Sequence, residues 1–251
     1  DDLSAQGFDI SFTGFTLDEL ETMRTEVINE GLVDEDSVPS IPLEPITKPG
    51  DIWVLGNHRL MCGDSTSVDA VDDLLGDGTP NLMVTDPPYG VKYTPEWREE
   101  AGKRVGETAK GKVENDDRID WTDAYCLFNG NVAYVWHAGL FAGDIATHLE
   151  NCGFDLVCQI IWVKQHFAIS RGDYHWQHEP CWYAVRKGKK HNWQGARDQA
   201  TTWYIPNNNS FGNPNAEKTW GHGTQKPIDC MTRPILNNSK SGEFVYDPFG
   251  G

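Results

Sequence analysis

Short apolar runs, separated by glycine, proline and polar residues, recur along the chain from residue 51 onward. Runs bounded in this way are typical of buried strands. The predicted strands are 52–55, 58–62, 81–85, 131–136, 156–164, 180–186 and 244–247. Stretches with a helical spacing of apolar residues, bounded by capping and glycine signals, predict helices instead. The predicted helices are 16–30, 68–75, 121–130, 140–151 and 227–236.

Strands that alternate with helices favour an α/β fold. Most of the predicted strands are apolar almost throughout, which is typical of a parallel sheet covered on both faces. The runs 156–164 and 180–186 follow each other without a helix and predict an antiparallel pair. The expected fold is therefore α/β, with a mostly parallel sheet that contains an antiparallel strand. In such sheets ligands bind beyond the carboxyl ends of the strands.

The first 49 residues differ in texture from the rest. Thr16 and Glu19 form a capping-box pattern that begins the predicted helix, and Gly31 ends it. An acidic run follows that contains Pro39, Pro42, Pro45 and Pro49. Proline at this density keeps a chain extended. We therefore predict a helical segment and an acidic, proline-rich linker over 1–49, and a main domain over 50–251.

Composition narrows the class of protein. With 38% hydrophobic and 24% charged residues the chain is globular rather than disordered. No run approaches the roughly 20 apolar residues that span a bilayer, so we expect a cytoplasmic protein without a membrane partner. Six cysteines without a C-x-x-C pair predict buried free thiols rather than a zinc site or a redox pair.

The net charge of −17 is unevenly distributed. The first 50 residues hold 12 acidic and 2 basic residues, which leaves −7 for the other 201. The total charge therefore does not exclude a nucleic-acid partner, and local basic clusters become candidates for phosphate contact. The candidates in the polar loop 90–118 are Lys92, Arg98, Lys103 and Arg104. The candidates after the predicted strand 180–186 are Arg186, Lys187, Lys189, Lys190 and Arg197.

Asp86, Pro87, Pro88 and Tyr89 directly follow a predicted strand. Two prolines fix the backbone and remove two N–H donors, and they restrict the residue before them as well. The turn thus presents a carboxylate, backbone carbonyls and an aromatic face. These groups suit a planar base with an exocyclic amino group, because carboxylate and carbonyl accept its hydrogens while Tyr89 stacks on the ring. A proline-stiffened strand exit with a capping Asp is the structural alternative.

Three further segments carry candidate chemistry. The glycine-containing turn from Asp247 to Gly251 follows the last predicted strand and lets a ligand approach the backbone closely. Asp64 ends the second strand of the predicted hairpin, where it can hold an amino group or cap the next helix. The polar stretch 222–227 leads into a helix, with Pro227 suited to its first turn.

Together, Asp86-Pro-Pro-Tyr89, Thr224-Gln-Lys-Pro227 and Asp247-Pro-Phe-Gly-Gly251 resemble the β class of amino-group DNA methyltransferases, in which the catalytic motif precedes the cofactor motif. The stretches 50–64, 161–164, 178–180 and 186–189 are also similar to family segments, and 50–64 resembles phage-type members. Residues 1–49 resemble the tail of the ParB-like domain that often precedes them. The resemblance covers about residues 50–251.

The resemblance implies a bacterial or phage-encoded enzyme with a Rossmann-like, S-adenosylmethionine-dependent methyltransferase fold and a circularly permuted motif order. Asp86 and the Pro87 carbonyl would hold the target amino group of a flipped base, and Tyr89 would stack on it. The residues implied in cofactor binding are Asp64, Asp86, His222, Thr224, Lys226, Asp247, Phe249, Gly250 and Gly251. Methyl transfer would be in line, without a covalent intermediate or a metal.

Two departures from the family pattern matter. Gly223 stands where family members have proline, which loosens that loop. The chain also ends before the glycine motif is complete, so we expect poor cofactor binding unless the natural protein continues. Double-stranded DNA is the expected partner, and a homodimer is possible. The irregular segment 187–221 is the candidate for recognition of the DNA sequence.

The predicted reaction is methylation of adenine N6, and cytosine N4 is the alternative because both amines fit the same turn. A leading Asp rather than Ser in the tetrapeptide favours adenine within the family. A catalytically silent DNA-binding fragment is the second alternative. A nucleotide hydrolase is disfavoured because the sequence has no phosphate-cradling G-x-x-x-x-G-K-[ST] loop.

Overall fold

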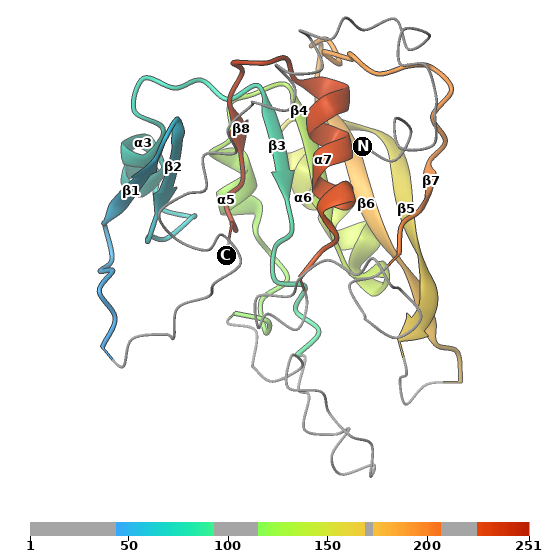
Figure 1. Cartoon of the computed structure of the whole chain (residues 1–251). Coiled ribbons are helices and arrows are strands. Elements are labelled where there is room, and N and C mark those ends of the chain that lie inside the picture. Colours follow the sequence, from blue (N-terminus) through green and yellow to red (C-terminus); the bar gives the residue numbers. More distant parts are fainter. Residues whose placement is uncertain (1–43, 93–114, 169–172, 207–224, 251) are drawn as a thin grey trace, which may run out of the picture. The chain divides into compact units, whose positions relative to one another are not determined.

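The computed structural model describes residues 44–92, 115–168, 173–206 and 225–250. Within these ranges the main sheet has the order β7-β5-β6-β4-β3-β8 (Figure 1). Its strands are β3 Leu82–Thr85, β4 Val132–Trp136, β5 Phe154–Ala168, β6 Trp176–Arg186, β7 Thr202–Tyr204 and β8 Val245–Tyr246. Strand β6 is antiparallel to both β4 and β5, whereas the other neighbours pair in parallel. The predicted sheet, mostly parallel with one antiparallel strand, is confirmed.

Helices cover both faces of this sheet. They are α3 Val68–Leu75, α5 Thr122–Cys126, α6 Ala142–Asn151 and α7 Ile228–Asn238. Side chains alternate along a strand, so Met83 joins the core beneath α3, α5 and α6, whereas Leu82 and Val84 join the core beneath α7. Figure 1 shows α7 in front of the sheet, with α5 and α6 behind it. None of the helices in the described ranges is long and apolar enough to cross a membrane.

The predicted hairpin near the start of the main domain is confirmed. Strands β1 Ile52–Leu55 and β2 His58–Met61 pair antiparallel, and the turn between them has Gly56 at a φ of 61°. A left-handed residue of this kind is what a tight two-residue turn requires. The Arg59 guanidinium donates to the Asp73 carbonyl of α3 at 2.9 Å, which attaches the hairpin to the helix that follows it.

Several boundaries differ from the sequence prediction. The helix predicted over 121–130 is only α5, because the chain turns after Leu127 and buries Phe128 against Phe154 and Tyr246. The helix predicted over 140–151 begins with a 3₁₀ turn, and the segment predicted as irregular contains β7. Trp176, at the start of β6, is 43% exposed. The predicted helix 16–30 lies outside the described residues.

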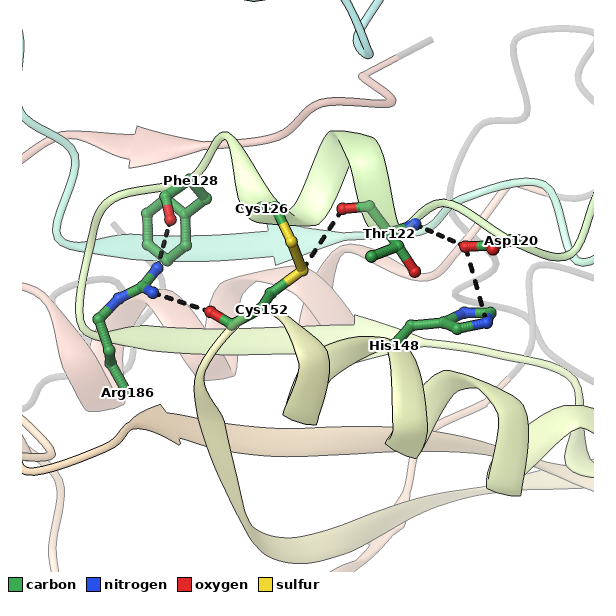
Figure 2. Close-up of a disulfide and its surroundings, with 7 residues drawn as sticks. All are labelled: Asp120, Thr122, Cys126, Phe128, His148, Cys152 and Arg186. Carbon is green, nitrogen blue, oxygen red and sulfur yellow. Dashed lines mark hydrogen bonds and ion pairs between the residues drawn. A yellow bond between two sulfur atoms is a disulfide. The ribbon is translucent and has the colours of Figure 1, made fainter.

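A disulfide links the ends of two helices on one face of the sheet (Figure 2). It joins Cys126, the last residue of α5, to Cys152 directly after α6. The prediction of free thiols is therefore wrong for this pair, which lies 26 residues apart and lacks any spacing signal. The other four cysteines are free thiols as predicted, but only Cys181 and Cys230 are buried, whereas Cys158 is partly buried and Cys62 is exposed.

Candidate active site

The two motif turns lie next to each other, at the carboxyl ends of two neighbouring strands. β3 and β8 are parallel neighbours, so the turns that follow their carboxyl ends leave the sheet at the same edge. Thr85 at the end of β3 donates a 2.6 Å hydrogen bond to Asp247 Oδ1, and the same oxygen accepts the Phe249 N–H at 3.0 Å. Burial raises the pKa of Asp247, while both hydrogen bonds oppose that shift. The convergence expected from the sequence is confirmed.

Trp121 provides a second connection between the turns. Its indole N–H donates to the Pro88 carbonyl at 3.0 Å, and its ring packs edge-on against Phe249 with centroids 4.8 Å apart. The Arg118 guanidinium lies over this indole, 4.2 Å from the ring centroid. The sequence analysis placed Trp121 in a helix and assigned it no function. The structure places it, 4% exposed, between the proline turn and the glycine turn.

Asp64 lies at the surface at the end of the small hairpin. Its carboxylate accepts the Thr66 N–H at 2.9 Å and the Thr66 hydroxyl at 2.7 Å. These bonds, with a smaller contribution from the Arg118 charge, lower the pKa of Asp64. The Asp-Thr turn is also a sufficient structural reason for this carboxylate.

Lys226 lies at the centre of a buried charge network on the α7 side of the sheet. Its ammonium contacts Asp86 Oδ1 at 2.9 Å, Glu179 Oε2 at 2.8 Å and the Tyr89 hydroxyl at 2.7 Å. Its side chain is only 8% exposed. Burial disfavours the charge, but the two carboxylates outweigh this and raise the pKa of Lys226. Lys226 is thus a buried cation beside the carboxylate of Asp86.

Glu179 holds the other side of this network. Its carboxylate pairs with Lys164 through Oε1 and with Lys226 through Oε2, and Oε2 also accepts the Tyr89 hydroxyl at 3.2 Å. Burial opposes ionisation, but Lys226 and Lys164 together lower the pKa of Glu179 to about 2. The antiparallel register brings these groups together, because Trp162 of β5 pairs with Glu179 of β6 and Lys164 follows two residues later.

Tyr89 is fixed by its hydroxyl rather than free to rotate. The hydroxyl accepts from Lys226 and donates to Glu179, and burial together with the nearby carboxylates raises the pKa of Tyr89 well above its ordinary value. A small cavity lies beside the proline turn. It is lined by Pro87, Pro88, Tyr89, Ile119, Trp136, His137, Ala138, Phe141 and Ile145.

His137 lines this cavity and is 1% exposed. Its Nδ1 lies 3.0 Å from the Ala138 carbonyl, which can only accept, so Nδ1 carries a hydrogen. Its Nε2 lies 3.4 Å from the Gln159 amide nitrogen. Burial lowers the pKa of His137, opposed by the Ala138 bond and aided by the Lys226 charge. Neutral His137 therefore adds no charge to the cavity.

The predicted basic cluster after β6 lies at the opposite end of the strands from the two motif turns. Arg186 pairs with Phe154 at the amino end of β5, whereas Asp86 follows the carboxyl end of β3. Its guanidinium donates to the carbonyls of Gly130 at 2.7 Å, Cys152 at 3.0 Å and Phe128, the last two drawn in Figure 2. The prediction of Arg186 as a DNA contact is corrected, because its side chain holds loops of the fold together.

The neighbouring predicted DNA contacts follow Arg186 away from the site. Lys187, Lys189 and Lys190 are exposed in the turn that begins at this amino edge. Exposed Arg197 lies in a stretch that bonds to the far end of α7, through Gln194 and Gln199 to Asn237. By contrast, exposed Lys92 follows the catalytic turn itself.

Some predicted site residues fall outside the described ranges. They are Arg98, Lys103, Arg104, His222, Thr224 and Gly251, together with the part of the recognition segment from 207 to 221. The structure thus brings together Asp86, Tyr89, Lys226, Asp247 and Phe249 from the predicted set. It adds Glu179 and Lys164, to which the sequence analysis assigned no role in the site.

Comparison with known proteins gives this arrangement a family. Residues 81–251 match the profile described as DNA methylase, an N6/N4 methyltransferase family. The chain belongs to the DNA methylase family. The resemblance inferred from the motifs is therefore confirmed, and the methylase motifs occur in the permuted order. Residues 1–49 match the profile described as the ParB-methyltransferase HTH domain, which confirms the resemblance of the first segment.

Individual relatives of this DNA methylase are more distant. Type II methyltransferase M2.MboI of Moraxella bovis is 32% identical over 93 residues, which are 37% of this chain and 28% of that protein. The chain thus matches less than a third of that relative. Two crystal structures of M1.HpyAVI, one of them a SAM complex, are 20% identical and cover 75% of this chain and 79% of theirs, with a TM-score of 0.48.

Proposed function

We propose that this DNA methylase transfers a methyl group from S-adenosylmethionine to the exocyclic N6 of an adenine flipped out of double-stranded DNA. The observation that carries the proposal is the turn at Asp86, whose carboxylate stands beside a buried cation at the carboxyl edge of the sheet. Flipping is required because the target nitrogen of a stacked base is out of reach of a recessed turn.

The turn leaves a defined pair of acceptors for an amino group. Asp86 Oδ1 contacts Lys226, and the Pro88 carbonyl accepts the Trp121 indole. We therefore assign Asp86 Oδ2 and the Pro87 carbonyl as the acceptors for the two hydrogens of the target amine. Both prolines lack N–H groups, so no donor of the turn competes with the amine. Tyr89, fixed by Lys226 and Glu179, would stack on the base.

The cofactor proposal rests on the chemistry of the glycine turn. Two carboxylates, Asp86 and Asp247, lie at the carboxyl ends of the strands, where their oxygens can contact a polar or cationic part of the cofactor. Phe249 against Trp121 provides an apolar wall. S-adenosylmethionine would supply an activated methyl group, with Phe249, Gly250 and Gly251 along its methionine side and Asp64 towards its adenine. His222 and Thr224 keep their proposed places at the pocket edge.

Adenine is preferred over cytosine on the sequence of the turn alone, where Asp86 leads the tetrapeptide. Cytosine N4 is the alternative, because its amine presents the same two hydrogens. We further propose that DNA meets the carboxyl ends of the sheet strands, with Lys92 among its phosphate contacts, and that the segment 187–221 includes the residues that recognise the DNA sequence. Residues 1–49 remain our proposed separate domain and linker.

The test uses the full chain, S-adenosylmethionine and duplex DNA, with mass spectrometry of the released nucleosides. N6-methyladenine is the expected product, and N4-methylcytosine would select the alternative. Asp86→Asn should lower turnover by about 100-fold or more, because a carboxylate acceptor is lost. The matched control is Asp144→Asn, the same change on the exposed face of α6. Near-normal turnover of Asp86→Asn with bound cofactor would contradict the assignment, and DNA binding without methylation would support a silent fragment.

A further inference from the structure

We propose that Glu179 is a positioning residue for methyl transfer, which acts by fixing Lys226 and the ring of Tyr89. This inference rests on the proposed function for the reaction, but its geometric part stands on the network itself. Glu179 belongs to the antiparallel strand β6, whereas Asp86, Tyr89 and Lys226 follow β3 or precede α7. The inference therefore concerns a residue outside the motif turns.

The ammonium of Lys226 has three close polar neighbours, one hydrogen-bonded hydroxyl and two carboxylates that form ion pairs with it. Asp86 Oδ1, Glu179 Oε2 and the Tyr89 hydroxyl lie 2.9, 2.8 and 2.7 Å from Nζ. A lysine carries a flexible stem with about 2 kcal/mol of rotamer entropy, so one contact does not define its position. Three contacts in different directions do, and Glu179 supplies one of them directly.

Glu179 also holds a second of these contacts in place. Its Oε2 accepts the hydroxyl of Tyr89, and that hydroxyl accepts from Lys226. The three groups thus form a closed ring of two hydrogen bonds and one ion pair. Lys164 anchors the outer oxygen of Glu179 from β5, and the backbone register of the β5–β6 pair fixes both residues. The position of Lys226 is thus fixed by contacts with residues of the sheet rather than of a loop.

The consequence reaches the reacting atoms through Asp86. Lys226 contacts one oxygen of Asp86, and this contact defines the direction in which the other oxygen points towards the target amine. Misplacing a group by about 1 Å costs on the order of 100-fold in rate, because the reacting geometry must be close to ideal. Loss of the Glu179 carboxylate should therefore lower kcat more than it weakens DNA binding.

The test is a double-mutant cycle in the full chain. Glu179→Gln keeps the size of the side chain and removes its charge, and we expect kcat to fall about 10-fold to 100-fold with less than about a threefold change in the KM for DNA. In a Lys226→Met background the same change should alter kcat by less than about twofold, since residues that act as a unit are not additive. Glu150→Gln on the exposed end of α6 is the matched control.

Two further measurements test the inference even where a variant does not fold or the chain does not methylate DNA. Glu179→Asp keeps the charge but is too short to reach both lysines, so it should fold and show an intermediate loss of kcat. In ¹⁵N-lysine NMR the wild-type chain should show a protected Lys226 ammonium signal, assigned by Lys226→Arg, that Glu179→Gln abolishes. Wild-type kcat in Glu179→Gln, equal losses in both backgrounds, or an unchanged ammonium signal would each overturn the inference. A wild-type chain that methylates no DNA refutes the proposed function, and the NMR comparison then decides the positioning alone.

Discussion

Thr85 and Asp247, separated by 162 residues, share a 2.6 Å hydrogen bond between the ends of β3 and β8. Thr85 is fully buried, and Asp247 uses the same oxygen to cap the N–H of Phe249. One carboxylate oxygen thereby sets the distance between the proline turn and the glycine turn. The parallel pairing of β3 and β8 brings these two turns, which lie far apart in the sequence, into direct contact.

Thr85→Val should loosen this contact without changing the volume of the core. Removing one donor from a buried carboxylate costs about 1 to 3 kcal/mol, which urea unfolding would measure. Because the glycine turn would shift, we also expect the Kd for S-adenosylmethionine to rise about tenfold in calorimetric titration. Thr147→Val, at an exposed hydroxyl of α6 that bonds to the Gly143 carbonyl, should change neither quantity. Equal behaviour of the two variants would contradict the role of Thr85.

Charge reversal at the two ends of the sheet strands should show which of the candidate residues contact DNA. Lys92→Glu, next to the catalytic turn, should weaken binding of a labelled duplex by about tenfold and reduce the salt dependence of the Kd by about one charge. Lys189→Glu, in the turn after Arg186, should weaken binding by less than about twofold, since it lies at the amino edge. Fluorescence anisotropy over a salt series measures both. A larger loss of DNA affinity in Lys189→Glu than in Lys92→Glu would indicate that the basic cluster after β6 contacts DNA.

His137 predicts a specific dependence of stability on pH. Burial lowers its pKa in the folded state below the ordinary 6.5, so the unfolded chain binds more protons at that site. The stabilisation is present above about pH 6.5 and is lost as the pH falls below it. The free energy of unfolding should therefore fall less in His137→Gln than in the wild type between about pH 7.5 and 5.5. His58→Gln, at an exposed histidine, should retain the wild-type slope.

The disulfide between Cys126 and Cys152 should contribute measurably to stability. Closing a loop with a separation of 26 residues restricts the unfolded chain by about 3 kcal/mol in the loop-entropy description. Reductant should lower the free energy of unfolding of the wild type. The free energy of unfolding of Cys126→Ser should already be low, and reductant should not change it. Cys62→Ser, which removes an exposed free thiol, should behave as the wild type. Alkylation and mass spectrometry would count the free thiols in each case.

The sequence predicts the centre of the sheet well and its periphery less well. The runs 81–85 and 131–136 become β3 and β4, which are buried along their whole length, so an apolar run suffices to find them. The stretch 121–130 shows why a helical period misleads. Phe128 is apolar at a helical position, yet it leaves the helix to fill the core beside Phe154. Periodicity records that a side chain is buried but not which backbone buries it.

The candidate site shows the same division. The motif turns were found because their backbone chemistry is local, as with the prolines after Asp86. Arg186 was misassigned because a sequence does not distinguish a solvated cation from one that donates to backbone carbonyls. Glu179 and Lys164 had a usable signal, since opposite charges at facing ends of a predicted antiparallel pair can meet. That signal depends on register, which the predicted strand ends did not define.

Trp121 contacts both halves of the crevice at once, through the Pro88 carbonyl and the ring of Phe249. A ligand that orders the glycine turn therefore also stiffens the support of the proline turn, and a base held by the proline turn does the converse. We therefore expect cofactor and DNA to raise each other's affinity, and thermodynamic reciprocity makes the two factors equal. In this methylase the two ligands should bind cooperatively, with an indole as the mechanical coupler between them.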